Sequence, residues 1–136
     1  HDETGFLHSF EELNSYKYYN DKLNAILSAG SSGGEEDKMA AEGYGHLRAA
    51  MEVCVEESVF KNVVKRYRKG VAFPALLRID CAKIEEHRES LNDIYEKCCV
   101  SIAGHSSPAE IHVSPTLAEL RVDFDMFKKL RTIFNQ

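Results

Sequence analysis

Apolar residues recur at intervals of three and four along most of this chain, which is the spacing of one face of an α-helix. The first stretch with this spacing predicts a helix over residues 4–29. Residues 30–37, with the sequence GSSGGEED, have the composition of a flexible linker or loop. The acids that end this segment suit the N-terminus of the next helix.

The second stretch predicts a helix over residues 37–69, ended by Gly70 and kept from resuming by Pro74. A helix of that length would span about 50 Å, which is long for a domain of this size. We therefore expect Gly43 and Gly45 to bend the helix or to mark a close helix crossing. The residues expected to face inward are Ala40, Tyr44, Leu47, Met51, Cys54, Val55, Phe60, Val63, Val64 and Tyr67.

The apolar residues 71–79 contain a proline, so we expect an extended segment or a single helical turn there rather than a central strand. A third helix is expected over residues 80–103, with Asp80 as its N-cap and Gly104 as its end.

A loop with a helix-start signal at Ser107-Pro108 follows, and a last helix is expected from Thr116 to about residue 134. Four amphipathic helices predict an all-α fold, either a four-helix bundle or an orthogonal helical array with one long central helix.

The composition predicts one helical domain over residues 1–136, with 43% hydrophobic and 29% charged residues. No apolar run approaches the ~20 residues that cross a bilayer, and the first residues do not resemble a secretory signal. We therefore expect a cytoplasmic protein with no membrane partner. Because the chain opens on His1 instead of methionine, we expect it to be a fragment of a larger protein.

The four cysteines, Cys54, Cys81, Cys98 and Cys99, include no C-x-x-C pair. Four cysteines could form two disulfides in a secreted protein, but a bridge between the adjacent Cys98 and Cys99 would be strained. Cys54 and Cys98 fall on the apolar stripes of predicted helices, where a free thiol behaves as a small hydrophobic group. We expect reduced, buried cysteines.

The most concentrated charge is a basic run over residues 61–69, formed by Lys61, Lys65, Arg66, Arg68 and Lys69 without an acid among them. The formal charge of the chain is −5, so the other residues sum to −10. Three interpretations stay open. The run could be a solvated helix end matched to the helix dipole, with Glu52, Glu56 and Glu57 upstream, or it could contact nucleic acid or an acidic protein face.

Catalytic signatures are weak. Glu42 and His46 could share a helix face, and His105 and His112 share a loop, but neither pair forms a known metal-binding spacing, so we expect no metal. The glycine-rich residues 30–34 lack the lysine and hydroxyl that end a phosphate-binding loop. We expect no cofactor, and no serine or cysteine stands out as a nucleophile.

One set of residues, from Tyr44 to Asp123, forms a pattern that is similar to one in a known family. Its members are Tyr44, Leu47, Arg48, Glu52, Val55, Glu56, Glu57, Phe60, Val63, Val64, Arg66, Tyr67, Arg68, His105, Pro115 and Asp123. With these residues, about residues 41–134 resemble a segment of the large SMC-like ABC ATPases of bacteria, the group that includes anticodon-nuclease and phage-defence ATPases. In that family the similar segment follows the ATPase head.

The resemblance implies a cytoplasmic defence or genome-maintenance protein whose ATPase head couples nucleotide state to a nucleic-acid target. The Walker motifs and the ABC signature are missing from this chain, so the ATPase residues of the family cannot be placed on it. The anticodon nucleases carry a catalytic Arg/His pair, and the nearest pair here, Arg78 and His87, is too widely spaced. Nuclease activity is therefore not implied.

Two hypotheses follow. In the first, the chain is a non-catalytic helical module that contributes packing, dimerisation or nucleic-acid contact, with the rest of a larger ATPase, a second copy, tRNA or DNA as partners. This hypothesis predicts an exposed basic ridge and no deep polar pocket. Its binding residues would be Arg48, Lys61, Lys65, Arg66, Arg68 and Lys69.

In the second hypothesis, the chain is a self-contained helical effector or enzyme domain, nuclease-like in character, with a polar site between helices. The residues of this site would be Arg48, His46, Glu56, Glu57 and His105. The hypothesis predicts that Arg48, Glu56, Glu57 and His105 converge within hydrogen-bonding distance and that the carboxyl pKa values are perturbed.

Overall fold

The computed structural model describes residues 15–30, 35–106 and 114–136, and among these the side chains of residues 103–106 are left aside. The described residues form helices and no strand, which confirms the all-α prediction. In chain order the elements are α2 (Tyr16–Ala29), α3 (Glu36–Cys54), the π-helical turn η3 (Val55–Val59), the 3-10 helix η4 (Phe73–Arg78), α4 (Cys81–Ser106) and α5 (Leu117–Phe134).

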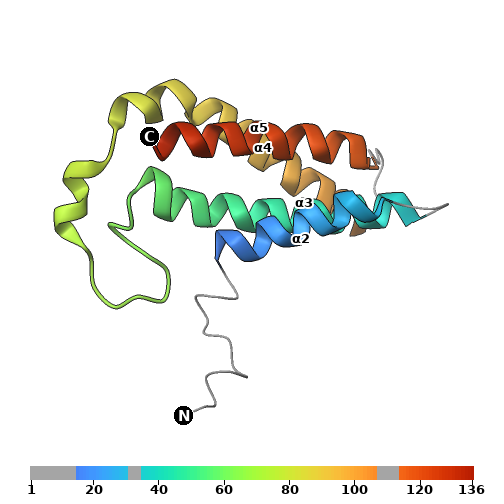
Figure 1. Ribbon diagram of the computed structural model, residues 1–136, viewed down its shortest axis with the longest axis horizontal. Helices are drawn as coiled ribbons and strands as arrows, with labels where there is room; N and C mark the ends of the chain where they lie inside the picture. The colour runs from blue at the N-terminus through green and yellow to red at the C-terminus, as the bar shows by residue number, and fades with distance from the viewer. Residues whose placement is uncertain (1–14, 31–34, 107–113) are drawn as a thin grey trace, which may run out of the picture.

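The four α-helices run alternately in opposite directions and lie side by side, as a bundle rather than an orthogonal array (Figure 1). Helix α3 is central, because it packs against α2, α4 and α5. The end of α3, the start of α4 and the end of α5 lie at the same end of the bundle. The loop that joins α3 to α4 projects from that end.

The core lies along α3. Tyr44, Leu47 and Met51 of this helix pack against Cys98 of α4 and Phe124 of α5, and all five side chains are buried. Burial of such side chains contributes roughly 1.5–3 kcal/mol each relative to exposure. The inward-facing pattern predicted for residues 40–54 is therefore confirmed.

Two predicted helix starts are confirmed by their caps. The Asp80 carboxylate accepts a hydrogen bond from the backbone N–H of Lys83 at 3.1 Å, as expected of an N-cap. Thr116 and Glu119 form a reciprocal capping box at the start of α5. Helix α4 ends later than predicted, because it continues through Gly104 to Ser106.

The first helix begins later than predicted. Ser15 has an extended backbone, with φ −85° and ψ 159°, and its side chain accepts a hydrogen bond from the N–H of Tyr18. An N-cap in this conformation interrupts a helix, so a single helix over residues 4–29 is wrong. Residues 4–14, residues 31–34 of the expected linker and the Ser107-Pro108 signal lie outside the described residues, and residues 36–37 already belong to α3.

Gly43 marks a close helix crossing, the second of the two roles expected for it. A Cβ atom at this position would collide with the side chain of Leu120 on α5, whereas Gly45 has open space around it. Helix α3 runs through both glycines, so neither of them interrupts it. The missing side chain of Gly43 thus allows α5 to approach α3.

The predicted continuation of the second helix from Phe60 to residue 69 is wrong. Lys61 and Asn62 both lie in the left-handed region, with φ of 52° and 59°, so the chain turns away directly after η3. A hydrogen bond of 2.8 Å from the N–H of Ala72 to the carbonyl of Val63 closes the loop. In the described part of the chain the central helix α3, with η3, therefore ends at Val59 and not at residue 69, and α4 is longer than α3, with 26 residues.

Candidate functional site

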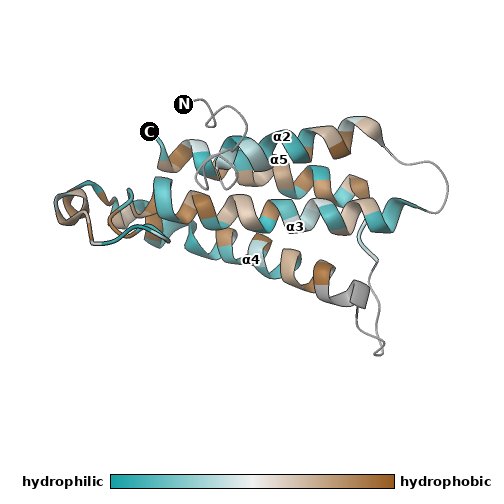
Figure 2. Cartoon of the chain, turned by 90° about the horizontal axis from the view of Figure 1, so that it is seen from below, coloured by the Kyte–Doolittle hydropathy of each residue, from teal (hydrophilic) through white to brown (hydrophobic). Residues whose placement is uncertain are grey.

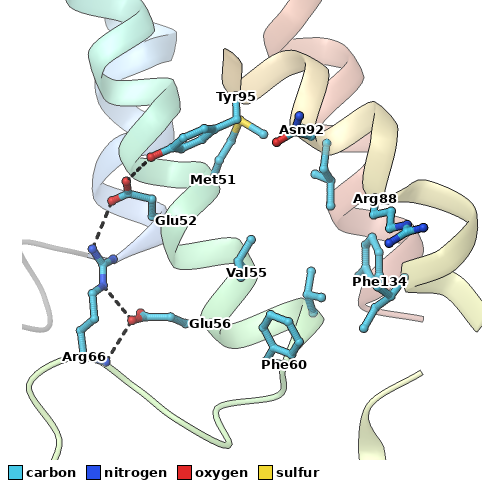
Figure 3. Close-up of a pocket in the computed structure, with 13 residues that line it drawn as sticks. Met51, Glu52, Val55, Glu56, Phe60, Arg66, Arg88, Asn92, Tyr95 and Phe134 are labelled. Carbon is cyan, nitrogen blue, oxygen red and sulfur yellow. Dashed lines mark hydrogen bonds and ion pairs between the residues drawn. The ribbon is translucent and has the colours of Figure 1, made fainter. Parts of the chain in front are cut away.

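An open cleft of about 620 Å³ lies between α3–η3 and the first half of α4, at the end of the bundle from which the loop projects (Figure 3). Most of its surface is apolar, and the apolar lining includes Met51, Val55, Val59, Ile84, Leu91 and Phe134. None of residues 81–93 of α4 is fully buried, whereas Ile94 and Cys98 further along the helix are. The first half of α4 therefore leaves an apolar channel open beside α3.

A chain of polar contacts follows one rim of the cleft. The Tyr95 hydroxyl donates a hydrogen bond of 2.7 Å to Glu52 and accepts one of 3.1 Å from Arg48 Nε. On its other side Glu52 accepts a bond of 3.1 Å from Arg66, and Arg66 Nε donates to Glu56 at 2.7 Å. Figure 3 shows how Arg66 lies between the two carboxylates.

These contacts leave the rim charges paired with one another. The hydrogen bond to Glu52, followed by partial burial, raises the pKa of Tyr95, so its hydroxyl stays protonated. Arg88 and Asn92 lie across the cleft on α4. The arrangement resembles an apolar binding groove with a polar border more than a catalytic centre, which needs a poised acid, base or nucleophile.

The basic run lies on a loop and not on a helix end, so its predicted match to the dipole of its own helix is wrong. Lys61 instead donates to the carbonyl of Phe134 at 2.6 Å, at the C-terminal end of α5. Arg68 donates to the carbonyl of Val63 at 2.9 Å, and Lys65 lies 4.0 Å from Glu57. Lys61 and Arg68 thereby hold the loop in its turned conformation.

The exposed basic ridge expected of the first hypothesis is only partly present. Arg66 is bound by Glu52 and Glu56, and Lys65 by Glu57, while Arg48 lies on α3 against Tyr95. Arg68 and Lys69 are exposed on the loop. Of the predicted binding residues, these two and Lys61, which binds the carbonyl of Phe134, have no carboxylate partner in the described part of the chain.

The residues of the alternative polar site do not converge where they are described. His46 lies 3.7 Å from Glu42 and against the ring of Tyr19 on α2, whereas Arg48 faces Tyr95 on α4. Glu56 and Glu57 bind different cations, Arg66 and Lys65. The side chain of His105 lies outside the described residues, so its part in this site stays a prediction.

Cysteine chemistry is not favoured in the core. All four thiols are free, and Cys54 and Cys98 are buried, as predicted. Burial raises the pKa of Cys54 to about 11 and that of Cys98 to about 12. A thiol is nucleophilic as the thiolate, so both groups are unreactive near neutral pH. Within the described ranges, no three His, Cys, Asp or Glu side chains are placed to hold a metal ion.

The sequence did not lead us to predict that the loop between η3 and α4 would form an exposed apolar surface. We call residues 60–79 the tip loop. Tyr67 is 79% exposed, Phe73 69% and Leu77 92%, and Val64 and Val71 are more than half exposed. Of the ten exposed large hydrophobic residues among those described, seven lie in the tip loop. Figure 2 shows these apolar stretches beyond the end of the bundle, beside polar ones.

The tip loop is also strongly basic, in contrast to the rest of the chain. Its 20 residues contain six cations and no acid, so the rest of the chain sums to −11. The sequence did contain a signal for this exposed surface. A stretch that carries six cations and a proline cannot bury all of its apolar residues. Helical periodicity through residue 67 instead assigned Phe60, Val64 and Tyr67 to the core.

No family model, curated protein or solved structure matches this chain. No helix in the described part is both long and apolar enough to cross a bilayer.

Proposed function

We propose that this chain is a non-catalytic interaction module whose open apolar cleft receives an apolar segment of a partner. The observation that carries the proposal is the cleft between α3 and α4, about 620 Å³ in volume and largely apolar, with its rim charges paired among themselves. Helix-in-groove recognition uses surfaces of this kind. The buried, protonated thiols of Cys54 and Cys98 support a binding role over one in cysteine-based catalysis.

The resemblance to SMC-like ABC ATPases extends this proposal. On that basis the module belongs to a larger bacterial defence or genome-maintenance ATPase in the cytoplasm, and the cleft serves packing or dimerisation in that protein. Exposed apolar surface at one end of an otherwise well-packed bundle supports such a role, because large exposed apolar patches mark interaction sites.

The accessibility of the cleft can be tested with the apolar anionic dye anilinonaphthalene sulfonate. We expect saturable binding with a fluorescence increase, and we expect Asn92→Trp, which fills the cleft from α4, to weaken binding at least about tenfold. Asp93→Trp, on the neighbouring exposed position outside the cleft lining, is the matched control. Equal dye binding by both variants, or none by the parent chain, would contradict the proposal.

Nucleic-acid contact through the tip loop is a second candidate function. The specific observation is that exposed Tyr67 and Phe73 stand among Arg68, Lys69 and Arg78, because aromatic rings stack on bases and cations contact phosphates. Mobility-shift titrations with tRNA and with duplex DNA at two salt concentrations would test it.

The double variant Arg68→Glu/Lys69→Glu should lose the shift in that assay, and higher salt should weaken the parent complex. Arg66 is unsuitable for this test, because its replacement also breaks the contacts to Glu52 and Glu56. A shift that survives the double variant would remove the tip loop as the contact surface.

A further inference from the structure

We propose that two copies of this chain assemble reciprocally, with the tip loop of each copy seated in the apolar cleft of the other. This inference rests on the proposed binding role of the cleft and names its occupant. It joins two features of the described structure, an open apolar groove beside α4 and an exposed apolar loop at the same end of the bundle.

Both surfaces expose apolar side chains. The 3-10 helix η4 carries the exposed residues Phe73, Leu76 and Leu77, and Leu77 is 92% exposed. The cleft wall includes Val55, Ile84 and Leu91, each of which is partly exposed. Insertion of η4 would remove apolar area from water on both sides, at roughly 25 cal/mol per Å² before the cost of association.

The charges around the two surfaces are also complementary. The tip loop carries six cations and no acid, whereas residues 80–93, the segment that includes the first half of α4, carry five acids and two cations. Glu85, Glu86, Glu89 and Asp93 are exposed there. These acids lie beside the cleft and not in its lining, whose charged side chains are Glu52, Glu56, Arg66 and Arg88. A basic tip loop that approaches the cleft therefore passes an acidic stretch of α4, which favours this contact over one between two tip loops.

The position of the two surfaces permits a closed pair. Both lie at the same end of the bundle. The tip loop projects beyond that end (Figure 1), and the residues that line the cleft come from the end of α3, η3, the first half of α4 and the end of α5. A two-fold axis at that end would place each tip loop against the cleft of the partner and use both surfaces twice. Such an isologous contact closes on itself and does not lead to filaments.

The decisive experiment is sedimentation velocity over a dilution series of the chain and two variants. Leu77→Asp alters the tip loop, and Asn92→Trp fills the cleft. We expect a monomer–dimer equilibrium for the parent chain and at least about tenfold weaker association for each variant. Val122→Asp on α5 is the control, because it changes an equally apolar residue, 64% exposed, away from this end.

A mixture of the two variants separates the reciprocal arrangement from other contacts. In a pair of Leu77→Asp copies both contacts are damaged, and the same holds for a pair of Asn92→Trp copies. A mixed pair keeps one intact tip loop facing one intact cleft, so mixing should restore dimers. Dimers that both variants weaken but that mixing fails to restore would overturn the reciprocal arrangement.

Two other outcomes would rule out a second copy as the partner of the tip loop. A parent chain that stays monomeric at all concentrations overturns the proposal, and if it still binds the dye, the interaction-module proposal survives without the second copy. Co-sedimentation with vesicles of phosphatidylserine, lost in Leu77→Asp, by a monomeric chain would instead indicate an anionic lipid surface.

Discussion

Arg66 binds Glu56 twice, through its backbone N–H at 2.9 Å and through Nε at 2.7 Å, both to the same carboxylate oxygen. These bonds join the tip loop to η3 across ten residues of sequence. The Glu56 carboxylate accepts hydrogen bonds from both the backbone N–H and the guanidinium of Arg66. It therefore fixes the direction of the loop and also pairs with the charge of Arg66. The loop conformation therefore depends on a residue that precedes it.

Replacing Glu56 with glutamine should loosen the tip loop. The amide accepts a hydrogen bond but carries no charge, and because Arg66 is about half exposed we expect a loss of unfolding free energy of no more than about 1 kcal/mol. The larger effect should be local, as faster trypsin cleavage within residues 61–69. Lys69→Ala, which removes an exposed cation, should leave the unfolding midpoint unchanged. Identical cleavage rates in Glu56→Gln and the parent chain would argue against this tether.

Gly43 and Gly45 offer a matched pair of substitutions within one helix turn. Gly43→Ala places a methyl group against Leu120, so we expect a loss of about 1–3 kcal/mol of unfolding free energy. Gly45→Ala meets open space and should add roughly 0.5–1 kcal/mol, because alanine favours the helix. Urea denaturation of both variants measures the difference. Equal effects would mean that α5 does not cross α3 closely at Gly43.

Loss of the capping box of α5 should lower the unfolding free energy more than loss of an ordinary surface threonine hydroxyl. Thr116→Ala removes the acceptor for the Glu119 N–H, 3.1 Å away, and should cost about 1 kcal/mol in thermal or urea unfolding. Thr132→Ala removes a bond to the carbonyl of Lys128 inside the helix and should cost much less. A smaller loss in Thr116→Ala than in Thr132→Ala would contradict the assigned start of α5.

The buried thiols predict a loss of stability at alkaline pH. The ordinary thiol pKa is 9.0, and burial raises it to about 11 for Cys54 and about 12 for Cys98. The unfolded chain releases these protons first, so the stabilisation is complete below the unfolded value and is lost as pH rises from there through the folded values. Unfolding free energy measured from about pH 8 to 11 should therefore fall.

Cys98→Ala should reduce that pH dependence, although it also lowers stability by leaving a small cavity. Cys81→Ala, at an exposed position, should leave the dependence unchanged. A thiol reagent should label Cys81 in the folded protein and reach Cys54 and Cys98 only on unfolding. Rapid labelling of either buried thiol under native conditions would show that the core opens locally.

Local signals in the sequence predicted most of the bundle. The stripe from Ala40 to Cys54, the Asp80 cap and the Thr116 capping box all depend on residues within a few positions of each other, and the structure confirms them. Periodicity failed after Val59, where Phe60 and Val64 continue the helical spacing without a neighbouring surface to bury them. No local rule indicates which face of a helix finds a partner.

The candidate site was harder to predict because its contacts are long-range. Tyr95 donates a hydrogen bond to Glu52, which is 43 positions away in the sequence. Lys61 donates one to the carbonyl of Phe134, which is 73 positions away. Nothing in the sequence near Tyr95 indicates that its hydroxyl would join Arg48 to Glu52. The cleft exists because the first half of α4 leaves α3 uncovered, which is a property of packing.

The uneven burial along α4 also has a dynamic consequence. Ile94, Cys98 and Ser101 are buried, while residues 81–93 have no fully buried side chain, so the two halves of one helix differ in local opening free energy. Amide hydrogen exchange should therefore rise steeply from Ile94 toward Cys81. Any occupant of the cleft would slow exchange mainly in that outer half, so the same helix would report whether the module is engaged.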